Sequence, residues 1–376
     1  MKTFLKIFLI FFVIDFLITS TILKKFEFLP NGIWEDQYWR IESDIYHHDL
    51  LPNIDIVENW GFNLKKRLVT NSLGFRDFSN KNIEKETDKK RVLLIGDSFI
   101  EGAGYDYAYT IGGLLQNYLG DDFEILNSAV SSYSPSIYYK KINHYLSKGY
   151  KFDQALIFLD VSDIYDELFI KFDENENIII EIKKSEQTLI RKIKNRIYNF
   201  GYILRDNTVT FRFIYLLSDK TEILKNYIKL KIKASKILDK SLFNTNRNDT
   251  MYYRMTHIDR GYWTFDENSY FEVQDGLQQS EKYLKKLFKL LDENNIKSNL
   301  IVYPWPTQIQ FGDTKHIVHW KNFSEFNNIN FVSLYDVFQS VDKRKLIFDN
   351  FIYGDIHWNK KGTLKVFNEI INKIKF

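Results

Sequence analysis

The chain has 376 residues, of which 44% are hydrophobic, so it is long enough for one large or two modest domains with a sizeable core. The formal net charge of +3, from 52 basic and 49 acidic side chains, gives no overall field that points to nucleic acid. The absence of cysteine excludes disulfides, thiolate metal sites and cysteine catalysis.

The N-terminal segment is apolar and basic at its start. Lys2 and Lys6 precede the apolar run 7–14, and the run 16–23 is interrupted only by Thr and Ser. Together they approach the roughly 20 apolar residues of a transmembrane helix, although Asp15 between them is unfavourable in lipid. Residues 1–25 therefore predict an uncleaved signal anchor. A cleaved signal peptide is the alternative, but no small-x-small cleavage site follows.

Residues 26–90 form a predicted N-terminal extension that looks irregular. It ends in a charged and polar segment, 80–90, typical of an exposed loop. His47, His48 and Asp49 are metal-ligand residue types. Adjacent histidines point apart on a strand and on a helix, so we predict no metal site here.

From residue 91 onward, short apolar runs alternate with amphipathic segments. The runs predict strands at 92–95, 123–126, 155–159, 300–303 and 331–334, and helices are expected at 110–118, 280–294 and 359–375. Strands that alternate with helices indicate an α/β domain with a parallel sheet of about five strands.

Residues 168–275 break this alternation and predict a mostly helical insertion in the domain 91–376. Within it, 181–240 predicts two or three long basic helices. Their lysines could bind an anionic polymer or anionic lipid headgroups. We favour the simpler interpretation of a solvated helix face, because exposed helices are normally charged.

Two short motifs carry the chemistry. Ser98 follows Gly96 and Asp97 at the end of a predicted buried strand, and the pair Asp355 and His357 precedes the last predicted helix. A serine, a histidine and an aspartate supply the nucleophile, base and orienting group of a serine hydrolase. Each motif alone also fits a simple strand-end turn or ordinary surface polarity. Their combination at opposite ends of one α/β domain predicts that folding brings them together.

These residues resemble the SGNH (GDSL-type) hydrolases, esterases and acyl-transfer enzymes with a flavodoxin-like fold. The resemblance covers 91–166 and 270–376, and it implies a three-layer α/β/α domain. Residues 96–98 are similar to the family's first block, whose serine is the nucleophile. Asp355 and His357 are similar to its last block, but they stand two residues apart where many members have three. This spacing resembles the alginate O-acetyltransferase-like members, which act next to membranes.

The two sequence blocks that supply the oxyanion hole in the family match this chain less closely. Ser132 stands where the family has a glycine whose N–H binds the oxyanion, and Ser162 stands where it has a donating asparagine. A serine keeps the N–H donor if its φ is negative, whereas the Ser162 side chain is shorter than asparagine. Losing one such donor slows catalysis about a hundredfold to a thousandfold. The resemblance thus implies an oxyanion hole from Ser98, Ser132 and, if it reaches, Ser162.

We therefore expect a serine esterase, or an O-acyltransferase, that acts through acyl-Ser98 without a cofactor. The expected substrate is an acylated carbohydrate or a small ester, with O-acetyl groups of an envelope or extracellular carbohydrate favoured. Trp305, Trp358 and Tyr133 are candidates for the substrate pocket, or equally for the core. The expected location is membrane-anchored through the N-terminal helix, with the catalytic domain periplasmic or extracellular. A non-catalytic carbohydrate-binding or assembly protein, and a lipid-acting esterase, are the alternatives.

Overall fold

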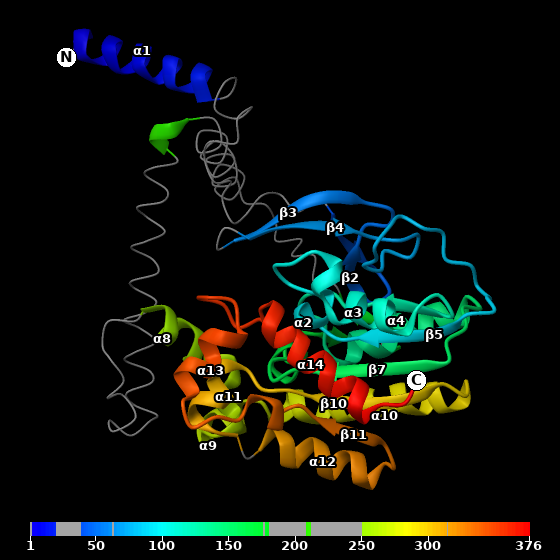
Figure 1. The fold of residues 1–376 in the computed structure, drawn as a ribbon. Helices are drawn as coiled ribbons and strands as arrows, with labels where there is room; N and C mark the ends of the chain where they lie inside the picture. Colours follow the sequence, from blue (N-terminus) through cyan, green and yellow to red (C-terminus); the bar gives the residue numbers. More distant parts are fainter. Residues whose placement is uncertain are drawn as a thin grey trace. The chain divides into compact units, whose positions relative to one another are not determined.

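The chain divides into two compact units in the computed structural model shown in Figure 1. One unit comprises Met1–Glu35 and Glu181–Leu242, and the other comprises Asp36–Ile180 and Phe243–Phe376. The structure describes residues 2–19, 39–61, 64–175, 177–179, 208–211, 250–313 and 315–376. The candidate catalytic residues all belong to the second unit.

The centre of the second unit is a parallel sheet of five strands in the order β11-β10-β7-β5-β6. Its strands are β5 (Lys90–Ile95), β6 (Phe123–Asn127), β7 (Gln154–Leu159), β10 (Lys297–Val302) and β11 (Asn330–Ser333). From the β6 edge, this order is 2-1-3-4-5 in chain sequence, the doubly wound order of flavodoxin-like folds. The predicted parallel sheet and its five strands are confirmed. All six residues of β7 are buried, as expected for a strand covered on both faces.

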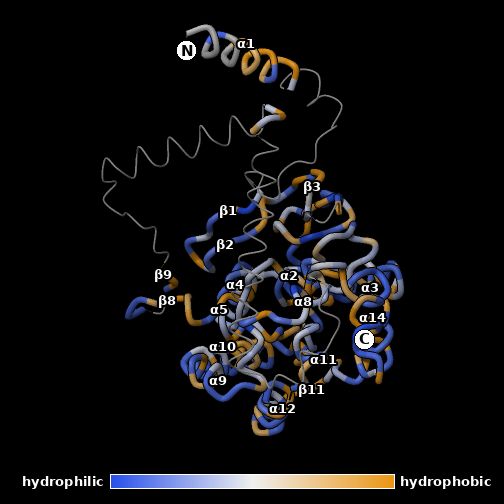
Figure 2. Tube along the Cα trace, turned by 90° about the vertical axis from the view of Figure 1, so that its left-hand side faces the viewer, coloured by the Kyte–Doolittle hydropathy of each residue, from blue (hydrophilic) through white to orange (hydrophobic). Residues whose placement is uncertain are grey.

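Helices cover both faces of this sheet. Helices α4 and α10 pack against each other, and Nε2 of His319 on α12 lies 3.1 Å from Oε1 of Glu281 on α10. Helices α3 and α14 pack together on the other side, so the layers are α/β/α. Figure 2 shows hydrophilic residues on the outer helices α9 and α14. The helices of this unit are α2 (Ser98–Glu101), α3 (Ile111–Leu119), α4 (Pro135–Ser147), α5 (Asp163–Glu167), α8 (Thr250–Thr256), α9 (Glu267–Glu272), α10 (Gln274–Glu293), α11 (Pro306–Phe311), α12 (His316–Phe326), α13 (Lys343–Asn350) and α14 (Lys360–Lys373).

The extension before β5 is more regular than we predicted. Two antiparallel pairs stand where the sequence looked irregular: β1 (Arg40–Ser43) with β2 (His47–Leu50), and β3 (Asp55–Gly61) with β4 (Leu64–Val69). The prediction failed because these strands bury charged side chains. Lys66 of β4 and Glu58 of β3 are each 1% exposed and form an ion pair of 2.9 Å. Buried charges hide the alternation of apolar residues that marks a strand.

The first unit contains α1 (Lys2–Ile18) and residues 208–211. Asp15 of α1 accepts hydrogen bonds from the backbone N–H groups of Val209 and Thr210 at 2.8 and 3.0 Å. Among the described residues, none of the helices is both long and apolar enough to cross a membrane. The basic helices predicted at 181–240 lie outside the described residues, apart from 208–211. The small strands β8 (Lys171–Phe172) and β9 (Ile178–Ile179) pair within the second unit.

Candidate active site

Ser98 is placed by the abrupt end of a buried strand. Strand β5 ends at Ile95, and Gly96 turns the chain so that Ser98 begins the short helix α2. A Cβ atom at Gly96 would lie 2.9 Å from Ile100 and 3.2 Å from Phe158, so a glycine is needed for this close approach. The Asp97 side chain caps α2 by accepting from the N–H of Phe99 at 3.0 Å. Ser98 therefore stands at the carboxyl edge of the sheet.

Asp355 and His357 lie on a tight loop between α13 and α14. The loop is closed by a bridge between Phe351 and Trp358 and by a hydrogen bond from Ile352 N–H to the His357 carbonyl oxygen at 2.8 Å. Gly354 has a φ of +82°, a conformation that glycine adopts without strain. This turn directs both side chains toward the end of β5.

Folding brings the three predicted catalytic residues together. The Nε2 atom of His357 lies 2.8 Å from the Oγ atom of Ser98, and its Nδ1 atom lies 2.7 Å from Oδ1 of Asp355. Ser98 is 9% exposed and His357 is 8% exposed, so the serine is close to the surface without being open to bulk water. A base between a hydroxyl and a buried carboxylate is the arrangement that activates a serine.

The other oxygen of Asp355 is held by a residue of the N-terminal extension. The indole Nε1–H of Trp60 on β3 donates to Oδ2 of Asp355 at 2.9 Å. Burial acts to raise the pKa of Asp355, but the attraction of His357 and the hydrogen bonds from His357 and Trp60 outweigh it and hold that pKa below its usual range. Asp355 is therefore an anion that orients the imidazole.

Ser98 also touches a cluster of buried carboxyl groups. Its Oγ atom lies 3.1 Å from Oδ2 of Asp97, and oxygens of Asp97, Asp160 and Asp163 lie within 4.8 Å of one another. Burial, reinforced by the charge of Asp160, raises the pKa of Asp97 well above its usual value. The Ser98 hydroxyl group therefore has two possible acceptors for its proton, Oδ2 of Asp97 at 3.1 Å and Nε2 of His357 at 2.8 Å.

This acidic cluster is the one group in the described residues with the composition and spacing of a metal site. Hydrogen-bond donors already point at its oxygens: Tyr303 to Asp97 at 3.1 Å, Trp305 to Asp160 at 2.7 Å and Tyr138 to Asp163 at 2.7 Å. Such donors satisfy carboxylate oxygens that a metal ion would otherwise use. The arrangement fits shared protons better than a bound cation.

Ser132 lies on the loop after β6, at the same sheet edge as Ser98. Its φ is +64°, so the negative φ that we set as the condition for keeping the N–H donor is not met: the serine takes the left-handed conformation that a glycine favours. The preceding residue is fixed at both ends, because Ser131 N–H donates to Glu101 at 2.8 Å and Ser131 O lies 2.8 Å from Nε2 of His48. Neither Ser98 N–H nor Ser132 N–H has a hydrogen-bond partner in the part of the chain that the structure describes.

Ser162 follows β7 and is 3% exposed. Its backbone N–H donates to Oδ1 of Asp160, a very short contact, so this group is not available to an oxyanion. Its hydroxyl is therefore what remains of the predicted third donor.

All three candidate pocket residues are buried in the core, the second of the two interpretations that we left open for them. Trp305 is 1% exposed and bonds Asp160, and Tyr133 is 1% exposed and donates to the His48 carbonyl oxygen at 2.7 Å. Trp358 is 3% exposed, stacks against Phe338 at 6.4 Å and lines, with His357, a cavity of about 10 Å³. That volume holds about one water molecule.

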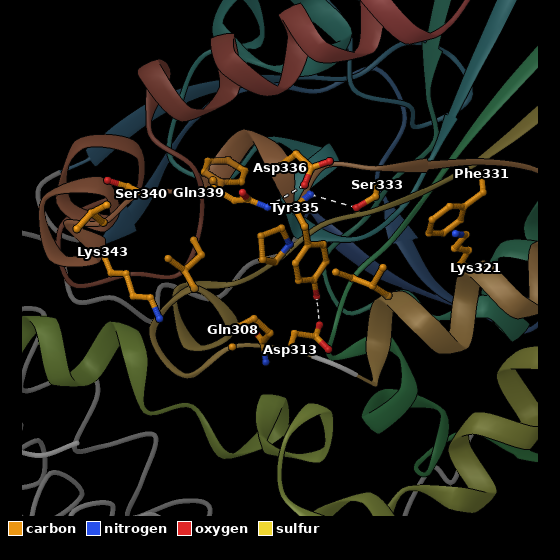
Figure 3. Close-up of a pocket in the computed structure, with 16 residues that line it drawn as sticks. Gln308, Asp313, Lys321, Phe331, Ser333, Tyr335, Asp336, Gln339, Ser340 and Lys343 are labelled. Atoms are coloured by element: carbon orange, nitrogen blue, oxygen red, sulfur yellow. Dashed lines mark hydrogen bonds between the residues drawn. The ribbon is translucent and has the colours of Figure 1, made fainter. Parts of the chain in front are cut away.

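A recess of about 890 Å³ lies elsewhere along the carboxyl edge, beyond β10 and β11. Figure 3 shows Tyr335 at its centre, with its hydroxyl group toward Asp313, and Lys343 on one side. Its lining includes Phe338, the stacking partner of Trp358, but none of Ser98, Asp355 and His357. The hydrogen bonds of the triad, and not the size of the recess, therefore locate the site.

Sequence reasoning missed the supporting residues of the extension and of α2. Trp60, His48 and Glu101 each bond a part of the site. His48 drew attention only as a possible metal ligand, and Trp60 and Glu101 belong to no local motif. Trp60 and Asp355 are 295 positions apart, so no spacing rule links them.

No family model matches the sequence, and no curated protein matches it. Solved structures show a distant similarity. A psychrotrophic esterase of Pseudoalteromonas sp. is 11% identical, over 76% of this chain and 96% of that one, with a TM-score of 0.35. A catalytic mutant of an acetylxylan esterase of Geobacillus stearothermophilus is 12% identical, over 78% and 97%, with a TM-score of 0.38. A lipolytic G-D-S-L protein of Veillonella parvula is 10% identical, over 75% and 97%, with a TM-score of 0.36.

Proposed function

We propose that the chain is a serine acyl hydrolase of the SGNH type that cleaves ester bonds through an acyl-Ser98 intermediate. One observation carries the proposal: His357 lies within hydrogen-bond distance of both the Ser98 hydroxyl group and the Asp355 carboxylate, at 2.8 and 2.7 Å. The position of Ser98 at the carboxyl edge of a 2-1-3-4-5 sheet supports it, because ligands of open α/β sheets bind there.

The reaction begins with attack of Ser98 Oγ on the ester carbonyl carbon while His357 Nε2 takes the hydroxyl proton. Asp355 stabilises the imidazolium that forms, and the N–H groups of Ser98 and Ser132 bind the oxyanion. The tetrahedral intermediate then collapses, the C–O bond of the ester breaks, and His357 gives its proton to the departing alcohol. Water, deprotonated by His357, attacks the acyl carbon and releases the carboxylic acid and free Ser98.

The finer parts of the proposal concern the substrate and the location. We propose O-acetyl groups of an envelope or extracellular carbohydrate as the substrate, with a sugar hydroxyl as the alternative acceptor in place of water. The sequence resemblance to acyl-transfer enzymes supports this choice. We also propose attachment to a membrane through residues 1–25, with the catalytic unit outside the cytoplasm, which the apolar runs 7–14 and 16–23 support.

Labelling with a fluorophosphonate tests the nucleophile. The full chain should be labelled, Ser98→Ala should not, and the exposed-residue control Ser147→Ala should label like wild type. Equal labelling of wild type and Ser98→Ala would overturn the assignment. Release of acetate from acetylated polysaccharides, lost in Ser98→Ala, tests the substrate class. Binding of such polysaccharides without any release would favour a binding or assembly protein.

A further inference from the structure

The two oxygens of Asp355 have different partners. Oδ1 lies 2.7 Å from His357 Nδ1 and also accepts from the backbone N–H of Ile356 at 2.6 Å. Oδ2 accepts one hydrogen bond within the described residues, from Nε1–H of Trp60 at 2.9 Å. The carboxylate is thus clamped between a histidine of its own loop and a tryptophan of the N-terminal extension.

The backbone of the extension aims Trp60 at this carboxylate. Strands β3 and β4 pair regularly from Asp55 to Asn59, and the register then shifts between Asn59 and Gly61, so that Trp60 occupies a β-bulge. A bulge bends its strand and redirects a side chain, and bulges are frequent next to active sites. In a regular strand, side chains alternate between the two faces of the sheet. The pairing with β4 would then decide to which face Trp60 points.

Neighbouring side chains hold the indole ring in place. The ring of Trp60 meets the His357 ring edge-on, at 5.2 Å between centroids and 90° between planes. The ammonium group of Lys66 on β4 lies 5.1 Å from the indole centroid. Lys66 is itself buried and paired with Glu58 at 2.9 Å, so the support continues into the charged interior of the extension.

We propose that Trp60 is a positioning residue of the catalytic site: it fixes the plane of the Asp355 carboxylate and moderates its basicity, and strands β3 and β4 are thereby part of the catalytic apparatus. This inference rests on the proposed function. A carboxylate held at both oxygens cannot rotate away from the imidazole, so His357 keeps the tautomer and orientation that accept the Ser98 proton.

Trp60→Phe keeps an aromatic ring and removes the N–H donor. We expect kcat for p-nitrophenyl acetate to fall about tenfold or more, with little change in KM, because misalignment affects the chemical step more than binding. Without the donor, the Asp355 anion becomes more basic and stabilises the imidazolium form of His357. The acid limb of the pH profile of kcat/KM should therefore move to higher pH, by about half a unit.

The matched control is Trp320→Phe on α12, because the Trp320 indole N–H is buried without a hydrogen-bond partner in the described residues. It removes the same atoms and should leave kcat and the acid limb at their wild-type values. Trp60→His returns a ring N–H and should recover part of the lost kcat. Thermal melting followed by circular dichroism identifies variants that are unfolded at the assay temperature, and those are assayed at lower temperature.

A readout that needs no turnover separates this inference from the proposed function. The low-field proton resonance of the His357–Asp355 hydrogen bond, assigned by its loss in His357→Ala, should shift or broaden in Trp60→Phe and stay in place in Trp320→Phe. An unchanged resonance together with wild-type kcat and an unmoved acid limb in Trp60→Phe would overturn the inference. Absence of Ser98-dependent activity in wild type would instead overturn the proposed function, and the resonance would still decide the role of Trp60.

Discussion

His357 Nε2 lies 2.8 Å from Ser98 Oγ, although 259 positions separate the two residues in the chain. The serine is fixed by the end of β5 and the start of α2, whereas the histidine is fixed by the loop closed between Phe351 and Trp358. Two separate parts of the chain therefore place the hydroxyl group that gives up a proton and the imidazole that accepts it. Residues that act as a unit in this way lose their function together.

Ser98→Ala and His357→Ala should each lower kcat for ester hydrolysis by about 10⁴-fold or more, and the double variant should be no worse than either single one. The reason is that the base has no role without the nucleophile, and the nucleophile is weak without the base. Steady-state kinetics of the three purified variants check this. Effects that multiply in the double variant would show that the two residues act in separate steps.

The central sheet could be predicted because its strands are buried on both faces. Strand β7 is a continuous apolar run after Gln154, and a short run of this kind is typical of a strand in the middle of a parallel sheet. Strands β3 and β4 could not be predicted in the same way. Their interior includes Glu58 and Lys66, whose burial depends on a pairing that becomes visible only after folding.

The proximity of Ser98, Asp355 and His357 was predictable, and the residues that support them were not. Ser98, Asp355 and His357 stand in short motifs with a recognisable composition, whereas Trp60 is one of seven tryptophans and has no distinguishing neighbours. Trp305 shows the converse problem. Its aromatic ring suits a substrate pocket and the core equally in sequence, and in the structure its indole N–H donates to the buried carboxylate of Asp160.

Glu101→Gln should destabilise the protein at pH 7 by about 3–5 kcal/mol, the usual effect of removing one partner from a buried ion pair. Glu101 is 1% exposed, accepts two hydrogen bonds from Arg40 at 2.8 and 3.0 Å, and holds Ser131 N–H. Burial acts to raise the pKa of Glu101, but Arg40 and Lys66 outweigh it and lower that pKa. The stability it provides is therefore present at neutral pH and lost as pH falls below about 4.

Urea unfolding at pH 7 and at about pH 2.5 measures this difference. The control Glu325→Gln changes an exposed glutamate whose contact with Lys321 is 3.8 Å, and it should change stability by less than about 0.5 kcal/mol. A Glu101→Gln protein as stable as the control at pH 7 would contradict the prediction.

Asp163→Asn should stabilise the protein at alkaline pH. Asp163 is fully buried, its Oδ1 has no hydrogen-bond partner in the described residues, and burial next to Asp160 and Asp97 raises its pKa well above the usual value. A raised pKa contributes stability that is complete below pH 4 and is lost as pH rises through the pKa of the folded state. Asparagine does not ionise, so the variant should exceed wild type at pH 8 by about 1–3 kcal/mol and equal it near pH 4.

Melting temperatures across pH 4–9 provide the test, with Asp292→Asn on α10 as a control of the same chemical change. The control should follow the wild-type curve. If Asp163→Asn has the wild-type pH dependence, then Asp163 does not carry the titration.

Asp355→Asn should lower kcat by about 10³–10⁴-fold, because the amide nitrogen cannot accept the Nδ1–H of His357 and favours the wrong tautomer. The same variant tests the depressed pKa of Asp355. A lowered pKa contributes stability above the unfolded value of about 3.9 and loses it as pH falls further. Wild type should thus be more stable than Asp355→Asn by about 1–3 kcal/mol at pH 7, and this difference should shrink as pH falls below 3.5. A gap that widens in acid would show that this carboxyl group is not held as an anion.

Ser132→Gly should keep wild-type activity, and Ser132→Val should lose it. Ser132 has a φ of +64°, where a β-branched residue is strained and glycine is not. Glycine relieves about 1 kcal/mol of strain but adds a similar entropy to the unfolded chain, so Ser132→Gly should melt within a few degrees of wild type. Valine should displace the N–H that we assign to the oxyanion, with a loss in kcat of about 10²-fold. Equal kcat values for the glycine and valine variants would remove Ser132 from the oxyanion hole, because the position of its N–H would then have no effect on the reaction.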